Sequence, residues 1–105
     1  MSIPSCVSKA FEIICRKHPD LPAIFYQKEY ITYSTLERVT RKTSQYFKPG
    51  QIIMVGIDEG KDLVALELAI WRSGATVCPF DIKRDPRARE VVSWVKPDLI
   101  VISLS

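Results

Sequence analysis

The segment Gly56–Lys61 contains the residue types of a phosphate-binding loop, namely two glycines and a lysine. An apolar run precedes it, and apolar residues at helical spacing follow it. A Walker loop has four residues between its glycines and Ser or Thr after the lysine, whereas here three residues intervene and Asp62 follows. The carboxylates of Asp58, Glu59 and Asp62 would repel phosphate but complement the dipole of a helix N-terminus. We therefore expect the start of a helix here, not a phosphate site.

Nucleophiles and metal ligands are few and poorly spaced. His18 is the only histidine, and its position before Pro19 at an expected helix end suits a partner of the helix dipole better than a catalytic relay. Cys6, Cys15 and His18 match no common zinc-ligand spacing, and Cys15 belongs to an apolar helix face. Cys78 lies in a short apolar strand and is expected to be a small buried hydrophobe. We predict no catalytic, cofactor-binding or metal-binding residue.

Charged residues cluster at the expected turns. The carboxylates of Asp58 and Glu59, and of Asp81 and Asp85, are typical of local turn hydrogen bonds and do not form a general acid/base pair. One local basic excess follows residue 82 without an interleaved aromatic residue, so a solvated surface is favoured over an anion or nucleic-acid patch. Its residues are Lys83, Arg84, Arg87 and Arg89.

Length and composition limit the classes of protein. The chain has 105 residues, 47% hydrophobic and 26% charged, with a formal net charge of +3 at pH 7, which fits one small globular domain and excludes a two-domain enzyme. The charge is too mild to imply nucleic acid. Three cysteines without a C-x-x-C pair, no signal-peptide pattern and no apolar run long enough to span a bilayer predict a cytoplasmic protein without a membrane partner.

Hydrophobic periodicity predicts alternating helices and strands. Helices are expected at Val7–His18 with Ser5 as N-cap, from a Thr32 or Ser34 cap to Phe47, at Lys61–Ser73 before Gly74, and from Pro86 to Val95. Strands are expected at Ala23–Tyr26 and Tyr30–Tyr33 as a hairpin, then at Gln51–Ile57, Ala75–Phe80 and Leu99–Ile102. Strands alternating with helices predict an α/β fold, a mostly parallel sheet with βαβ crossovers.

The third predicted helix has no continuous polar face, because Asp62, Glu67 and Arg72 point about 140° apart in succession at ~100° per residue. Such a helix is normally buried on all sides. The final strand, Leu99–Ile102, is also expected to be buried, yet no helix pattern follows it. Both features predict that packing partners are missing; the alternative is a self-contained fold with partly exposed leucines.

Two stretches together resemble a known family. They are Ile31–Leu36 (ITYSTL) and Ala69–Asp81 (AIWRSGATVCPFD), which are similar to the first two core motifs of the adenylate-forming, or AMP-binding, superfamily of acyl-CoA synthetases, luciferases and peptide-synthetase adenylation domains. The helix end and strand at His18–Ile24 and the turn into a strand at Lys48–Ile53 also resemble that family. Ile82 departs from the proline that often follows the second motif.

This resemblance implies the N-terminal subdomain of an adenylation domain spanning residues 1–105, closer to amino-acid-activating than to fatty-acyl enzymes. In the family the two motifs are mainly structural. Here Tyr33 and Leu36 would pack the start of a helix, Gly74 would permit a positive φ, and Pro79 with Asp81 would fix a turn.

Complete relatives use ATP and Mg²⁺ to form an acyl-adenylate and pass the acyl group to a thiol. The phosphate loop, the nucleotide-binding motifs and the adenylation lysine have no counterpart in this sequence. The resemblance thus implies that this chain alone binds no cofactor and is inactive, and that its partner is the remainder of an adenylation domain or a protein covering the third helix and last strand. The open alternatives are a non-catalytic interaction module and an unrelated small nucleotide-binding protein.

Overall fold

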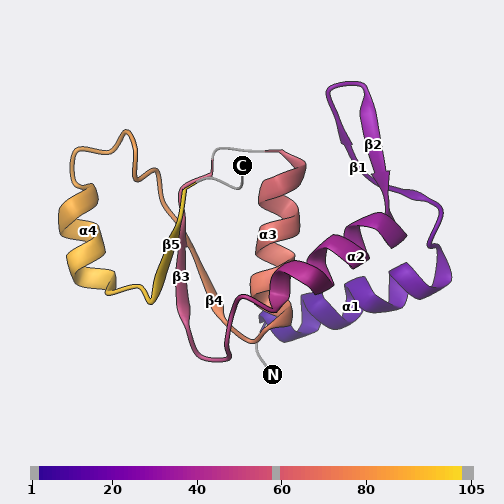
Figure 1. Cartoon of the computed structure of the whole chain (residues 1–105), viewed down its shortest axis with the longest axis horizontal. Coiled ribbons are helices and arrows are strands. Elements are labelled where there is room, and N and C mark those ends of the chain that lie inside the picture. Colours follow the sequence, from indigo (N-terminus) through magenta and orange to yellow (C-terminus); the bar gives the residue numbers. More distant parts are fainter. Residues whose placement is uncertain (1–2, 58–59, 103–105) are drawn as a thin grey trace.

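The computed structural model describes residues 3–57 and 60–102. Its first half contains a long helix, a hairpin and a second helix (Figure 1). These elements are α1 (Ile3–Lys17), β1 (Pro22–Tyr26), β2 (Glu29–Thr32) and α2 (Tyr33–Ser44). The second half alternates strands and helices, as β3 (Ile52–Val55), α3 (Lys61–Arg72), β4 (Thr76–Pro79), α4 (Ala88–Val95) and β5 (Leu99–Val101).

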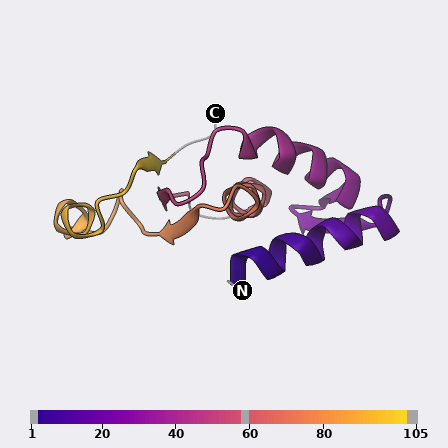
Figure 2. The same cartoon turned by 90° about the horizontal axis from the view of Figure 1, so that it is seen from below.

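The three later strands form a parallel sheet in the order β4-β3-β5. The helices α3 and α4 lie on opposite sides of this sheet (Figures 1 and 2). This is expected because the connection from β3 to β4 and the connection from β4 to β5 run in opposite directions across the sheet, and crossovers between parallel strands are right-handed. β1 and β2 pair separately as an antiparallel hairpin, with Gln27 and Lys28 at positive φ in the two-residue turn. The predicted α/β class is confirmed, although the parallel sheet is small and the hairpin is not part of it.

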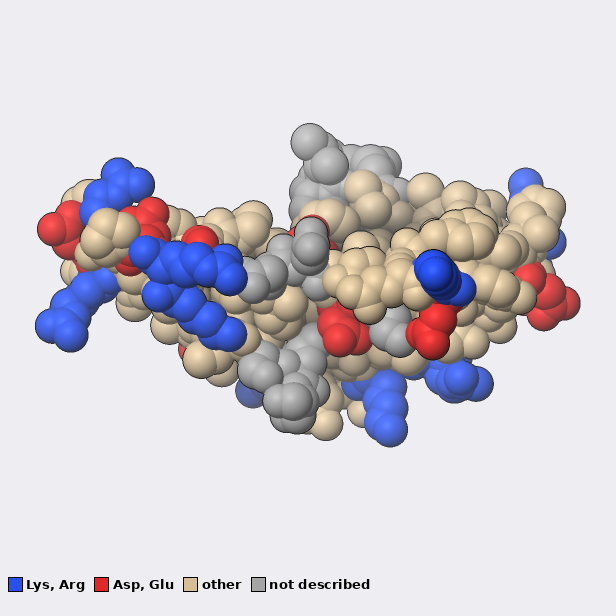
Figure 3. All heavy atoms as spheres, turned by 90° about the horizontal axis from the view of Figure 1, so that it is seen from above, with Lys and Arg blue, Asp and Glu red and all other residues tan. Residues whose placement is uncertain are grey.

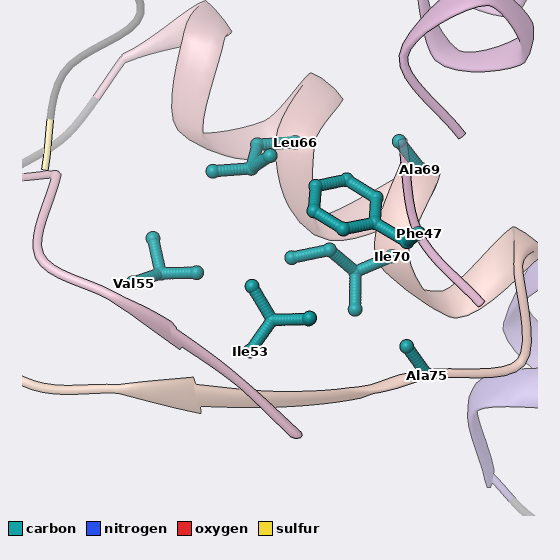
Figure 4. Packing of buried hydrophobic residues seen from close by; sticks show 7 residues of the cluster. All are labelled: Phe47, Ile53, Val55, Leu66, Ala69, Ile70 and Ala75. Carbon is teal, nitrogen blue, oxygen red and sulfur yellow. The ribbon is translucent and has the colours of Figure 1, made fainter. Parts of the chain in front are cut away.

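One core lies between α3 and the sheet. Seven buried apolar residues form it, and Figure 4 shows the ring of Phe47 over α3 with the strand residues facing it. They are Phe47, Ile53, Val55, Leu66, Ala69, Ile70 and Ala75. Burying this many apolar side chains against one helix fixes α3 on the sheet, because each fully buried one stabilises the fold by about 1.5–3 kcal/mol.

A second core joins α3 to α1 and α2. Phe11 and Cys15 of α1, Leu36 of α2 and Ala65 of α3 are its buried members, and Tyr33 packs against it with its ring 6.5 Å from that of Phe11. The predicted packing of Tyr33 and Leu36 at the start of α2 is confirmed. Thr32 caps this helix, since its hydroxyl accepts a hydrogen bond from the Thr35 N–H at 3.2 Å.

The end of α3 confirms the role predicted for Gly74. Ser73 is the C-cap, Gly74 has φ +85°, and its N–H donates to the Trp71 carbonyl while the Ala75 N–H donates to that of Ile70. This pair of bonds is a Schellman motif, which needs a left-handed residue at the position that Gly74 occupies. The motif turns the chain directly into β4.

Several predicted boundaries are wrong. Ser5 lies inside α1 and is not its N-cap, because the helix begins two residues earlier. The second helix ends at Ser44, not Phe47, and α4 begins at Ala88, not Pro86. The apolar pattern continues past the end of α2 because Phe47 joins the main core from the adjoining turn.

One burial prediction also fails. β5 is not buried: Leu99 and Ile100 are 40% and 45% exposed. α3 is buried toward the sheet and toward α1 and α2, yet its Val64 remains 41% exposed, which agrees with the prediction that this apolar helix lacks part of its packing. Helix and strand patterns report apolar surface, but they do not report whether a neighbour is present to cover it.

Within the described residues, no helix combines the length and hydropathy needed to cross a membrane.

Candidate functional site

The turn that resembles a phosphate loop is described only in part. Residues 58 and 59 fall outside the described chain, so the predicted dipole role of Asp58 and Glu59 stays a prediction. Gly60 is the N-cap of α3, with φ +105° and no side-chain cap. A Cβ on Gly60 would lie 3.4 Å from the Tyr26 ring, and one on Gly56 would lie 3.4 Å from Ile82. Both distances are ordinary van der Waals contacts, so the positive φ, and not close packing, explains a glycine at position 60.

The candidate nucleophiles are separated or packed in the interior. Cys15 is buried on α1 and its thiol donates to the Tyr33 carbonyl at 3.5 Å. Burial, and then the neighbouring Glu37 carboxylate, raise the pKa of this thiol, which disfavours the reactive thiolate. His18 is exposed just after α1, and the side chain of Cys6 is not among those described. Cys78 is only half-buried in β4, so it is more exposed than the buried hydrophobe that the sequence predicted.

Asp81 and Asp85 act in the turn before α4, as predicted. Asp81 accepts from the Arg84 N–H at 3.3 Å, and Asp85 accepts from the Arg87 N–H at 2.8 Å. The hydrogen bond from the Arg87 backbone, followed by that from its side chain, lowers the pKa of Asp85. Arg84 and Arg87 also pair with these two carboxylates, at 3.6 and 3.4 Å, so the basic group around α4 is partly neutralised (Figure 3).

A charged cluster that the sequence did not predict links three helices. Arg72 of α3 lies 3.5 Å from the Glu12 carboxylate of α1 and 3.2 Å from that of Glu37 on α2, and Arg41 pairs with Glu37 at 2.6 Å. These residues line a polar hollow of about 320 Å³. Because each carboxylate already faces a guanidinium, the cluster is suited to holding helices together more than to binding a ligand.

An open apolar groove lies between the helical part of the molecule and β5. Its volume is about 610 Å³, and α2, the turn after it, α3 and β5 provide its walls. The lining residues are Val39, Thr43, Tyr46, Phe47, Asp62, Ala65, Leu66, Leu99, Ile100 and Val101. We call this feature the β5 groove.

The β5 groove exposes large side chains to solvent. Tyr46 is 75% exposed, and Val39, Leu99 and Ile100 are each exposed by 40% or more. Among the described lining residues, Asp62 is the one that carries a charge. An exposed apolar hollow of this kind is typical of surfaces that another polypeptide covers. The groove is formed in part by α3 and β5, the two elements for which a missing packing partner is predicted.

Parts of these features can be predicted from the sequence. Val39 and Tyr46 belong to the apolar pattern of the second helix, and Leu99–Ile102 is an apolar run. What the pattern could not indicate is that these residues meet around one hollow, since α2 and β5 are more than 50 residues apart in sequence. Likewise, nothing in the spacing of Glu12, Glu37 and Arg72 predicts that they pair.

Comparison with known proteins gives consistent results. No protein-family model matches the chain. In sequence, it is 32% identical over 83 residues to malpibaldin synthetase of Mortierella alpina, which is 74% of this chain and 2% of that protein. It is 33% identical over 93 residues to nonribosomal peptide synthetase 5 of Aspergillus fumigatus, which is 84% of this chain and 4% of the relative.

Solved structures agree on the fold. An artificially fused adenylation-PCP di-domain, NpsA-ThdA, from Klebsiella oxytoca superposes on 91% of this chain with a TM-score of 0.83 at 22% identity. A fatty acyl CoA synthetase of Mycobacterium tuberculosis superposes equally well, with a TM-score of 0.83 at 12% identity. The chain matches the N-terminal portion of the adenylate-forming superfamily.

The match to this superfamily covers only part of each relative. The chain spans 19% of the Klebsiella di-domain and 26% of the separately solved N-terminal subdomain of NpsA. The two adenylate-forming motifs fall on structural positions: the first runs through β2 and the start of α2, and the second runs from the end of α3 through β4. Both motifs therefore build the two cores and leave the β5 groove open.

Proposed function

We propose that residues 1–105 are a partial adenylation domain, a structural portion of an enzyme that activates a carboxylate with ATP and transfers it to a thiol. The observation that supports this most is the superposition of 91% of the chain on adenylation-domain structures, combined with peptide-synthetase relatives in sequence. Since those sequence relatives are peptide synthetases, an amino acid is the favoured carboxylate. The odd number of cysteines, without a C-x-x-C pair, supports a cytoplasmic location.

The chain by itself is proposed to be inactive. Adenylate formation concentrates negative charge on phosphorus, so it requires positioned hydrogen-bond donors and cations. In the part of the chain that the structure describes, no three His, Cys, Asp or Glu residues gather into a metal site, and the β5 groove is apolar. These features support the proposal that the chain alone does not bind ATP with Mg²⁺, and we assign its residues no step of the reaction.

The role proposed for this portion is to pack against the rest of an adenylation domain through the β5 groove. The groove places Leu66, which belongs to the main core, next to exposed Tyr46 and Ile100. A covering element there would extend the existing core without rearranging it. The two sides of α3 that already carry neighbours would keep them.

A chimaera tests this proposal. The region of Aspergillus fumigatus nonribosomal peptide synthetase 5 that matches this chain is replaced, within its adenylation domain, by residues 1–105. We expect amino-acid-dependent exchange of pyrophosphate into ATP from the chimaera and none from the 105-residue chain. Exchange by the chain alone, or a folded chimaera without exchange alongside an active unmodified domain, would contradict the proposal.

The exposed groove also favours a second candidate, a non-catalytic interaction module that uses the same surface for a separate protein. Native mass in extracts of the source cells distinguishes the two. A heavy polypeptide reactive with an antibody against residues 83–89 supports the enzyme portion. A 105-residue product held in a fixed complex supports the module.

A further inference from the structure

The polar hollow between α1, α2 and α3 is lined by more cations than anions. Its charged lining residues are the arginines Arg16, Arg41 and Arg72 and the glutamates Glu12 and Glu37. Arg72 pairs with both carboxylates, and Arg41 pairs with Glu37. Among the described residues, Arg16 takes part in no ion pair. The hollow therefore holds one guanidinium whose charge no carboxylate balances.

The ion pairs of this hollow join α1 and α2 only through α3. Arg72 of α3 lies 3.5 Å from the Glu12 carboxylate of α1 and 3.2 Å from that of Glu37 on α2. In the part of the chain that the structure describes, no ion pair runs directly from α1 to α2, although both helices contribute to the second core. An anion on α2 beside Arg16 of α1 would supply that link.

Ser34 places a hydroxyl at the hollow. It lies in the first turn of α2, is exposed to solvent, and lines the hollow together with the three arginines. Its oxygen lies 3.2 Å from the Thr32 hydroxyl, but the N-cap bond of α2 runs from the Thr35 N–H to Thr32 and does not use Ser34. The Ser34 N–H is already bonded to the Pro19 carbonyl, at 2.9 Å. An anion attached to the Ser34 oxygen would therefore leave the cap in place and find its donors in the guanidiniums.

We propose that Ser34 is a phosphorylation site, and that its phosphate pairs with Arg16 and Arg41 and so links α1 directly to α2. Phosphoserine carries about −1.5 to −2 charge at pH 7 and three acceptor oxygens, and arginine binds such oxygens through two parallel N–H···O bonds. A free anion would have to compete with Glu12 and Glu37 for these cations, whereas a covalent bond holds the phosphate of Ser34 at the hollow at a high effective concentration. The site shares no residue with the β5 groove, so the inference does not depend on the proposed function.

The modification requires a separate serine kinase with ATP as the phosphoryl donor. The Ser34 oxygen forms a bond to the γ-phosphorus, and the bond from that phosphorus to the oxygen bridging it to the β-phosphate breaks. ADP leaves, and the hydroxyl proton passes to the base of the kinase. The exposure of Ser34 leaves its hydroxyl accessible to such an enzyme.

The first test identifies the acceptor. The 105-residue chain is incubated with ATP, Mg²⁺ and an extract of the source cells, and mass spectrometry maps the phosphorylated residues. The expected result is phosphate on Ser34, absent from the same peptide of the Ser34→Ala variant. Phosphate only on other hydroxyls, such as Thr35 of the same turn, or no phosphate at all would overturn the proposal.

The second test measures the link between the helices. Phosphoserine is incorporated at position 34, and thermal unfolding is compared with that of the unmodified chain. We expect the phosphate to raise the melting temperature, and Arg16→Gln to remove about half of this rise or more, because groups in contact are energetically coupled. Lys17→Gln is the matched control. It removes one positive charge from the next residue of α1, which does not line the hollow, and should leave the rise nearly unchanged.

Two outcomes of this second test would contradict the pairing. A lower melting temperature after phosphorylation would show that repulsion from Glu12 and Glu37 outweighs attraction by the guanidiniums. Equal losses in Arg16→Gln and Lys17→Gln would show a general effect of net charge and no specific pair. Neither measurement involves adenylate formation, so neither outcome bears on the proposed function.

Discussion

The helical part of the molecule and its sheet part differ in how fully their apolar side chains are buried. Around α3, the helices α1 and α2 bury Phe11, Leu36 and Ala65 and add the Arg72 cluster. Beyond the sheet, α4 has no fully buried residue and β5 has two residues at least 40% exposed. The difference teaches that α1, α2 and α3 bury a shared core, although Ile13, Val39 and Tyr46 stay exposed, whereas α4 and β5 contain no fully buried side chain.

The largest expected effect is the difference in unfolding free energy between a variant of the main core and a variant of β5. Ile70→Ala removes a side chain with no exposed surface in the main core, and we expect it to cost about 2–5 kcal/mol of unfolding free energy. Ile100→Ala at the open edge should cost less than about 0.5 kcal/mol, because that residue is nearly half-exposed. Urea unfolding of both variants measures the contrast; similar losses would show that the edge is already packed.

The Arg72 cluster is expected to contribute less. Arg72→Met leaves Glu12 and Glu37 without their shared partner while keeping an apolar stem, and should cost about 1–2 kcal/mol because the side chains are mostly buried. Arg41→Met is the control, since Arg41 is 65% exposed and should contribute about 0–1 kcal/mol. Thermal unfolding at low and high salt measures both. An equal loss in the two variants would mean that Arg72 does not join the helices.

Two glycines offer a finer comparison at the join between the two parts. Gly74 and Gly50 have nearly the same φ, +85° and +84°, and the Gly50 N–H donates to the Gly74 carbonyl. Alanine at either position should cost about 1–2 kcal/mol of conformational strain. A Cβ at Gly74 would lie in ordinary van der Waals contact with Pro49, at 3.4 Å, and none of the described atoms lies within 4 Å at Gly50, so neither position adds a clash. The two variants should therefore lose similar stability in thermal unfolding. A Gly74→Ala variant as stable as the unmodified chain would contradict the left-handed φ of the Schellman motif.

The smallest expected effect concerns Glu67 on α3. Partial burial raises the pKa of its carboxyl above 4.5, so the folded chain binds this proton more tightly than the unfolded chain does. The contribution of the Glu67 carboxyl to the free energy of unfolding is therefore most favourable below pH 4.5, and it declines as the pH rises through the raised pKa of the folded chain. Glu67→Gln should flatten this part of the stability–pH curve, as followed by urea unfolding between pH 4 and 7. An unchanged slope would show that Glu67 is fully solvated.

Much of the fold could be predicted from local pattern. The hairpin, the Thr32 cap and the Gly74 helix end were all indicated by residue type and spacing, because turns and caps depend on a few neighbouring residues. The ends of α2 and α4 were misplaced by up to three residues. Tertiary contacts decide such ends, since Phe47 joins the main core from a turn and not from the helix.

The candidate site could be predicted only as apolar surface that lacks a packing partner. The sequence alone determined that α3 and the last strand carry more apolar surface than a small domain can cover, and that two motifs of the adenylate-forming superfamily occur in order. The tertiary structure decided where that surface remains open, because it brings α2 and β5 to the two sides of α3. It also decided which strands lie at the two edges of the sheet: the order β4-β3-β5 puts Pro79 in one edge strand and Ile100 in the other, which composition alone does not indicate.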